Sequence, residues 1–107
     1  MLKNSYEENK KIMKHIGDIY KKAKKRVDVF HFNNCIEENW AVYDADRQLI
    51  HLIERTLRDC NSDTKNIIQH DYLRVSHSRW YEPYYSRTSY YRLKKKAIEE
   101  FLTLLNI

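Results

Sequence analysis

Small polar and basic residues open the last segment of the chain that has helical periodicity, residues 86–102. Arg, Thr and Ser side chains at the tip of a helix can reach base edges in a nucleic acid, and neighbouring lysines can hold its phosphates. The pattern favours a recognition helix over a terminal core helix with a solvated basic face. The candidate contact residues are Arg87, Thr88, Ser89, Tyr91, Arg92, Lys94, Lys95 and Lys96, together with Arg79 upstream.

The helix that must position these residues begins with a start signal. Ser86 is a candidate N-cap, because its hydroxyl can accept a hydrogen bond from the free amide of Ser89. Apolar residues then recur every three or four positions and predict one buried face. That face comprises Tyr90, Leu93, Ala97, Phe101 and Leu104.

The composition of the 107 residues fits one helical domain with a modest core. Gly17 is the only glycine and Pro83 the only proline, so little interrupts helices and a turn-rich all-β fold is disfavoured. The net charge of +5 is unevenly placed: basic residues dominate at both ends of the chain, and acidic residues dominate in the middle. Such a layout suits a protein with one side facing a polyanion.

Residues 4–26 have the pattern of a first amphipathic helix. A bundle helix with a solvated lysine face is favoured over a phosphate-facing arm or an amphipathic membrane helix. Gly17 would allow close packing. The apolar residues, which could serve the core or a homodimer interface, include Ile12, Met13, Ile16, Ile19, Tyr20 and Ala23.

Two more helices are expected before the last one. Residues 44–60 predict a helix capped by Asp44, and residues 63–73 predict a short helix capped by Ser62 or Asp63. Residues 27–43 are compatible with a short helix near 29–41 or with extended chain. The expected seam of the 44–60 helix is Ala45, Leu49, Leu52, Ile53, Leu57 and Cys60, and that of the 63–73 helix is Ile67, Ile68, Tyr72 and Leu73.

The other reactive residue types form no recognisable catalytic or metal-binding pattern. Cys35 and Cys60 lack a second ligand pair and are expected to be buried free thiols. The histidines are scattered, neighbouring glutamates diverge on a helix, and no glycine-rich phosphate loop exists. We therefore expect neither an enzyme nor a bound cofactor or metal.

Aromatic residues crowd the segment before the last helix and its first turn. Together with nearby arginines they could stack on single-stranded bases. Packing at the junction of the last two helices is favoured for Trp80, Tyr85 and Tyr90, whereas Tyr84 and Tyr91 are expected to be more exposed.

The N-terminal 26 residues are charged throughout and resemble no signal peptide, and no apolar run reaches the length of a membrane span. These features predict a cytoplasmic protein without a membrane partner.

Residues 49–105 resemble region 4 of sigma factors and the related ArpU-type phage transcriptional activators. The shared outline is an amphipathic helix (Leu49–Leu57), a break (Asn61–Asp63), a helix with Ile67-Ile68 and Tyr72-Leu73, and a helix-turn-helix (Trp80–Leu105). The most specific match is the segment Ser86–Ile98, which follows the pattern S/T-R-x-x-apolar-x-x-apolar-x-x-K-A-apolar. The end of the chain is also similar to that of small mollicute proteins.

The resemblance implies a role for each position of the last helix. Arg87, Thr88, Ser89 and Arg92 stand where those families contact bases or phosphates, Tyr90, Leu93 and Ala97 stand at core positions, and Lys94, Lys95 and Lys96 lie near the DNA backbone. One departure concerns the supporting helix of the helix-turn-helix. Pro83 precedes the place of its turn, so that helix is expected to be shortened to a turn or lost.

Together these features predict an all-α domain of four to five helices over residues 1–107, with an N-terminal helical part (1–43) and a helix-turn-helix-like part (44–107). The expected function is a transcriptional regulator that binds double-stranded DNA. The alternative is an interaction module that docks on RNA polymerase or another regulator through aromatic and acidic surfaces, the latter formed by Glu37, Glu38, Asp44 and Asp46. RNA binding through Trp80, Tyr84 and Tyr91 is a third, weaker hypothesis.

Overall fold

The part of the chain that the structure describes forms four α-helices and one π-helical turn. The computed structural model describes residues 4–32 and 40–107, and the side chains of residues 4–29 and 41–107. In chain order the elements are α1 (Tyr6–Phe32), α2 (Trp40–Arg58), α3 (Ser62–Ile68), the π-helix η2 (Gln69–Leu73) and α4 (Arg87–Leu104). The described residues contain no strand. The prediction of an all-α fold with four to five helices is confirmed.

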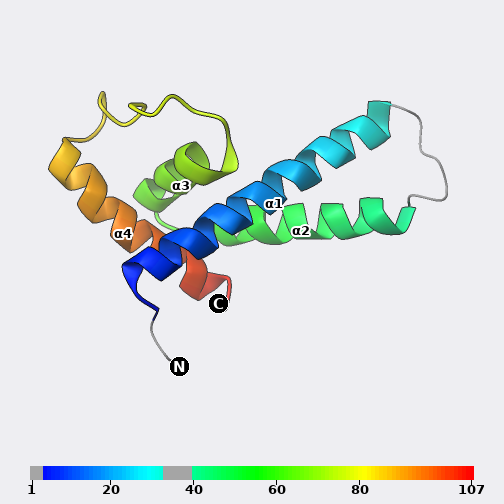
Figure 1. Ribbon diagram of the computed structural model, residues 1–107, viewed down its shortest axis with the longest axis horizontal. Helices are drawn as coiled ribbons and strands as arrows, with labels where there is room; N and C mark the ends of the chain where they lie inside the picture. The colour runs from blue at the N-terminus through cyan, green and yellow to red at the C-terminus, as the bar shows by residue number, and fades with distance from the viewer. Residues whose placement is uncertain (1–3, 33–39) are drawn as a thin grey trace.

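The two long helices α1 and α2 run antiparallel and form a hairpin (Figure 1). The C-terminal elements gather at one end of this hairpin, where α3 packs on α4, η2 packs on α1, and α4 also contacts α1 and α2. The other end of the hairpin projects alone. The molecule is therefore elongated, with principal dimensions of 49 × 36 × 22 Å.

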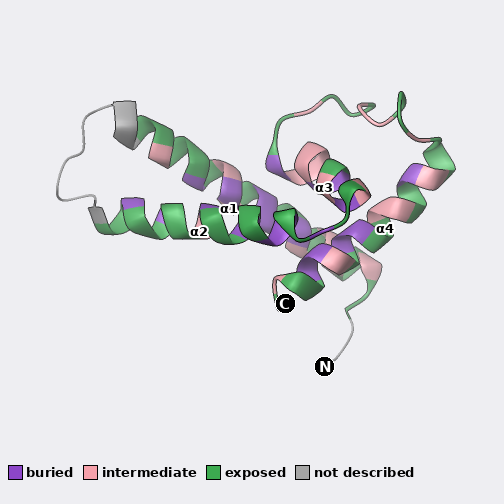
Figure 2. Cartoon of the chain, turned by 180° about the vertical axis from the view of Figure 1, so that it is seen from behind, coloured by how far each residue is buried: buried purple, intermediate pink, exposed green. Residues whose placement is uncertain are grey.

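The core lies where all four helices meet. Its fully buried large side chains come from every helix, and burial of each such side chain contributes about 1.5–3 kcal/mol. Figure 2 shows buried residues concentrated on the facing sides of the helices. The largest are Met13, Ile53, Ile67, Ile68, Ile98 and Phe101.

Two helix boundaries differ from the sequence-based prediction. The first helix does not end at residue 26 but continues to Phe32, because no glycine or proline interrupts this stretch. The second helix begins at Trp40, so Asp44 lies inside it and is not its cap. Of the segment 29–41, for which a short helix or extended chain was expected, residues 29–32 belong to α1 and residues 40–41 belong to α2. The residues between them lie outside the described part of the chain.

The buried face of α2 is rotated from the one that the apolar pattern predicted. Ala45 and Leu52 are exposed, while Asp46 is only 6% exposed. Asp46 accepts two hydrogen bonds from the Arg26 guanidinium, at 2.7 and 2.9 Å. This bidentate pair fixes a polar residue on the side of α2 that faces α1. The buried face of α2 therefore also includes Tyr43 and Ile50.

The buried face of α4 is wider than predicted. Leu104 is exposed, whereas Ile98 and Leu102 are buried beside the expected Tyr90, Ala97 and Phe101. The reason is that α4 packs against α1 and α2 as well as against α3.

Gly17 provides the close packing expected of it. A Cβ atom at this position would lie 2.4 Å from the backbone carbonyl oxygen of Tyr72. Real Cβ atoms do not approach a backbone oxygen so closely, so α1 and η2 could not pack as they do with a larger residue.

The start of α3 is stabilised by residues that sequence patterns did not identify. The N-cap is Asn61, not Ser62 or Asp63: its side-chain oxygen accepts from the Thr64 amide at 2.9 Å. The Asn61 backbone amide donates to Glu100 of α4 at 2.8 Å. The cap therefore also joins α3 to α4.

Cys60 precedes this cap and is a buried free thiol, as expected. Burial, assisted by the neighbouring Glu100 carboxylate, raises the pKa of the Cys60 thiol to about 12. A thiol whose pKa is raised in this way is a poor nucleophile at neutral pH, because the thiolate is the reactive form. The side chain of Cys35 lies outside the described residues.

Candidate nucleic-acid interface

The N-terminus of α4 has the predicted cap. The Ser86 hydroxyl accepts a hydrogen bond from the Ser89 amide at 3.2 Å, and Ser86 has an extended backbone conformation. This bond satisfies one of the amides that a helix start leaves free. The cap defines where the basic residues of α4 begin.

One side of α4 is exposed and basic. Arg87, Thr88, Arg92, Lys95 and Lys96 are all exposed, and their spacing places the last four on one side of the helix. Within the described part of the chain, none of the four cations forms an ion pair with a carboxylate. We call these five residues the α4 basic face. Their charges are available to an external anion.

Two predicted contact residues lie at the edges of this face. Tyr91 is 49% exposed, and the Arg87 guanidinium lies 6.0 Å from the centre of its ring, in a cation–π contact. Ser89 is half-buried and its amide is used by the cap. Tyr91 thus orients Arg87 and also presents an aromatic surface to solvent.

Lys94 does not belong to the exposed face. Its ammonium lies 3.3 Å from the Asp71 carboxylate, and its side chain is only 18% exposed. The ammonium also lies 5.4 and 5.7 Å from the ring centres of Tyr72 and Tyr90. The expected phosphate contact by Lys94 is corrected on this ground, because its charge is already neutralised inside the protein.

Arg79 lies outside α4 in an exposed turn. Its Nε atom is 3.6 Å from the Glu82 carboxylate, and both side chains are largely exposed. A long, solvated pair of this kind contributes little stability. Arg79 therefore remains able to change partners, although it is not part of the α4 basic face.

Turns replace a regular supporting helix before α4. Residues 78–84 are held by short-range backbone bonds, in which the amides of Trp80, Glu82 and Tyr84 each donate to the carbonyl three residues earlier. Pro83 cannot donate and does not continue a helix. The helix that precedes α4 is therefore α3 with η2, and a long connection replaces the short turn of a standard helix-turn-helix.

Asp71 of η2 anchors this connection to α4. Its carboxylate accepts from the Trp80 indole at 2.8 Å and from the Tyr90 hydroxyl, and it forms the ion pair with Lys94. Three partners on two segments thus converge on one carboxylate, whose side chain is 13% exposed. Sequence patterns did not identify Asp71, because its partners lie 9 to 23 residues away.

Aromatic packing completes the junction. Tyr81 stacks on Tyr90 with ring centres 3.8 Å apart, and Trp80 stacks on His70 at 4.2 Å. The Tyr85 hydroxyl donates to Asp63 of α3 at 2.6 Å. The prediction that Trp80, Tyr85 and Tyr90 pack the junction is confirmed. Tyr84, at 73% exposed, is the most solvent-facing tyrosine of the segment, as expected.

The junction should weaken as pH falls, because burial there disfavours the protonated form of His70. Burial, with a smaller contribution from Arg74, lowers the pKa of His70 below its ordinary 6.5, although Asp71 opposes the shift. As the pH falls, His70 therefore binds a proton at a higher pH in the unfolded chain than in the folded chain. The free energy of unfolding should therefore decrease as the pH falls from neutral through 6.5.

Urea denaturation at several pH values measures this effect. His70→Gln should remove part of the pH dependence in that range, whereas the exposed His15→Gln on α1 should leave it intact. An identical pH profile for the His70 variant and the parent protein would rule out His70 as the cause.

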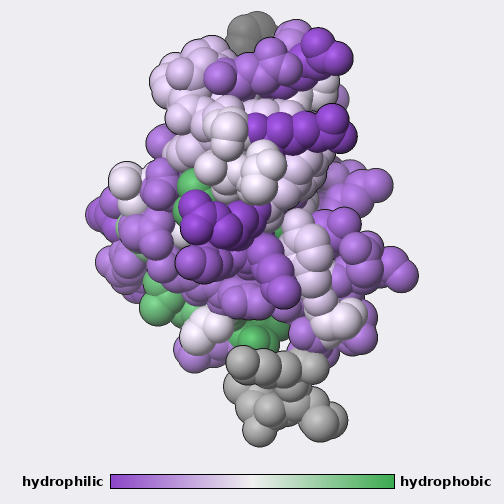
Figure 3. Space-filling model, turned by 90° about the vertical axis from the view of Figure 1, so that its left-hand side faces the viewer, coloured by the Kyte–Doolittle hydropathy of each residue, from purple (hydrophilic) through white to green (hydrophobic). Residues whose placement is uncertain are grey.

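The α4 basic face is freely accessible. Figure 1 shows the N-terminal end of α4 at the edge of the molecule, on the side opposite to the projecting end of the α1–α2 hairpin. Viewed from that side, the surface is largely hydrophilic with only small hydrophobic areas (Figure 3). A large ligand could approach this side without displacing another element.

The acidic surface of the alternative hypothesis is less well supported. Asp46 is buried in its pair with Arg26, whereas Asp44 is exposed. Glu37 and Glu38 lie outside the described residues. Ile16 is buried in the core of its own chain, so only Ile12 and Ile19, which are half-buried, could still contribute to a homodimer interface.

The described residues contain no second kind of site, beside the α4 basic face, that is marked by a metal cluster or a membrane span. Among the described residues, no three His, Cys, Asp or Glu side chains cluster as metal ligands would, and no helix is long and apolar enough to cross a membrane. No family model matches the chain, and no curated protein and no solved structure is significantly similar to it. The resemblance to sigma region 4 stays a prediction.

Proposed function

We propose that this protein binds double-stranded DNA through α4 and acts as a transcriptional regulator. The observation that carries the proposal is the α4 basic face: four exposed cations form no ion pair within the described part of the chain, and three of them, Arg92, Lys95 and Lys96, share one side of a capped helix at the edge of the fold. The role in transcription rests on the resemblance of residues 49–105 to sigma region 4.

The dimensions of the helix suit the major groove. The first ten residues of α4 span about 15 Å, and the major groove of B-DNA admits an α-helix. Arg87, Thr88 and Arg92 would lie nearest to the bases, since base edges are read by the N-terminal residues of a recognition helix. Lys95 and Lys96, further along the same face, would contact the phosphates.

Replacing Arg87 and Arg92 together with Ala should weaken duplex binding by about tenfold to a hundredfold at moderate salt. The dependence of log affinity on log salt should also become shallower by about 2, because two fewer counterions are released. Fluorescence anisotropy with a labelled mixed-sequence duplex measures both quantities.

The matched control is Arg47→Ala with Arg55→Ala, which removes two exposed arginines from α2. This control should keep nearly all of the affinity. The proposal would be contradicted if the α4 variant, shown by circular dichroism to be folded, bound the duplex with the same affinity as the parent protein. Equal losses in both double variants would show that net charge alone is responsible.

A further inference from the structure

A second concentration of positive charge lies in a groove between α1, α2, α3 and η2. The groove has a volume of about 1030 Å³ and no residue of α4 lines it. Six cations line it, against two carboxylates, Asp28 and Glu54. The cations are Lys21, Lys24 and Lys25 of α1, Arg58 of α2, Lys65 of α3, and Arg74, which directly follows η2. The groove is thus separate from the α4 basic face.

These cations have no compensating partners in the described part of the chain, where none of the six forms an ion pair. One of the two carboxylates, Glu54, interacts with the Tyr20 hydroxyl and raises the pKa of Tyr20, although burial is the larger cause. The groove therefore keeps a strong positive potential, which its concave shape focuses.

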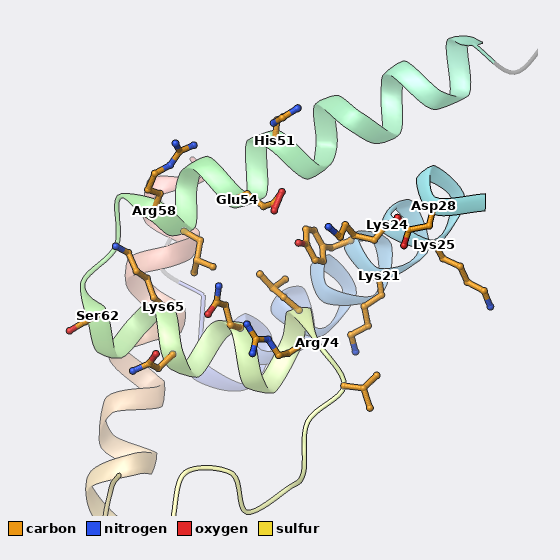
Figure 4. A pocket seen from close by; sticks show the side chains of 16 residues that line it. Lys21, Lys24, Lys25, Asp28, His51, Glu54, Arg58, Ser62, Lys65 and Arg74 are labelled. Atoms are coloured by element: carbon orange, nitrogen blue, oxygen red, sulfur yellow. The ribbon is translucent and has the colours of Figure 1, made fainter. Parts of the chain in front are cut away.

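The cations come from different elements of the fold and line the same groove. In Figure 4, Lys24 extends from α1 into the groove and Arg74 lies beside it on the η2 side, whereas Lys25 points away from the groove. Arg58 and Lys65 stand at the end of the groove where α2 leads into α3. An anion with several charges could contact both ends at once.

The size of the groove decides which anion fits. Pockets for small molecules have volumes of about 300–1,000 Å³, and this groove matches the upper end of that range. A DNA duplex is too wide to enter a concavity of this size and would touch only its rim. A compact anion can be surrounded by cations from all the lining helices.

The polar lining indicates phosphate groups rather than a single carboxylate. Ser62, Asn66 and Gln69 add hydroxyl and amide donors between the cations. Phosphate oxygens accept several hydrogen bonds each, and both Lys and Arg bind them well. Leu73 adds a buried apolar side chain beside Arg74.

We propose that this groove binds a compact polyphosphate chain, either free or attached to a nucleoside. The site would hold the phosphates between Lys24 and Arg74 at one end and Arg58 and Lys65 at the other. The proposal does not depend on DNA binding by α4, because the two sites share no residue.

Isothermal titration calorimetry with inorganic tripolyphosphate and with ATP, both without divalent cations, tests the proposal. We expect dissociation constants in the micromolar range. Replacing Lys24, Lys65 and Arg74 together with Ala should weaken binding by about 30-fold. The matched control replaces Arg92, Lys95 and Lys96 with Ala, which removes the same residue types and charge from α4, and it should bind within about threefold of the parent protein.

Binding of both probes, with a selective loss in the groove variant, supports a site for the polyphosphate chain itself. Binding of ATP alone, with the same selective loss, supports the nucleoside-attached form. The proposal is overturned if neither probe binds, or if both triple variants lose affinity equally. Amide chemical shifts of the parent protein on addition of tripolyphosphate give an independent test that needs no variant: they should change at Lys24, Lys65 and Arg74, and changes elsewhere only would contradict the site.

Discussion

Replacing Asp71 with Ala should lower the free energy of unfolding by about 3 kcal/mol. The substitution removes the acceptor for the Trp80 indole and the Tyr90 hydroxyl, and it leaves the poorly exposed Lys94 ammonium without its counter-charge. Removing one partner from such a network lowers stability by more than the net contribution of the lost hydrogen bonds, because the remaining polar groups stay desolvated without a partner.

Urea denaturation followed by circular dichroism measures this change. The control is Asp44→Ala, because Asp44 is an exposed aspartate on α2 and its loss should alter stability by less than about 0.5 kcal/mol. Asp71→Asn should fall between the two, since an amide oxygen can still accept one bond but cannot pair with Lys94. A stable Asp71→Ala variant would mean that aromatic packing alone holds the segment before α4.

Gly17→Ala should destabilise the protein by about 1–3 kcal/mol, although alanine is the better helix former. In an open helix the substitution would stabilise by about 1 kcal/mol. Here the added Cβ would meet the carbonyl oxygen of Tyr72 at 2.4 Å, and this oxygen belongs to backbone that cannot rotate away. The expected effect is therefore opposite in sign to the effect of helix propensity.

Thermal and urea unfolding of Gly17→Ala determine the sign. Asp18→Ala is the appropriate control, because the neighbouring residue is exposed on the same helix and should be neutral or slightly stabilising. A gain in stability for Gly17→Ala would contradict the close packing of α1 on η2.

Local sequence patterns were sufficient to predict the helices but not how they are joined. Apolar periodicity located the four α-helices of the described residues, and Ser86 was recognisable as a cap because its partner is three residues away. The cap of α3 was assigned to the wrong residue because Asn61, Ser62 and Asp63 are all favoured N-cap residue types, and the sequence does not show which of them accepts from the helix amide. The rotation of α2 depends on the Arg26–Asp46 pair, which joins two separate helices.

The same distinction applies to the candidate sites. The exposure of Arg87, Thr88, Arg92, Lys95 and Lys96 follows from one helix and could be predicted from its periodicity. Lys94 is one residue away in sequence, yet it faces Asp71 on another element, and no local pattern shows that contact. The groove could not be predicted from the sequence either, because its cations are spread along the chain and lie near one another only once the helices have packed.

The most direct test of the proposed function is a map of the surface that contacts DNA. Amide chemical shifts measured by NMR during titration with a mixed-sequence duplex at low salt would give this map. If α4 binds the duplex, the largest changes should lie between Ser86 and Lys96, and they should diminish as salt increases. Large changes confined to other surfaces, such as the lysines of α1, with the α4 amides unmoved, would contradict DNA binding by α4.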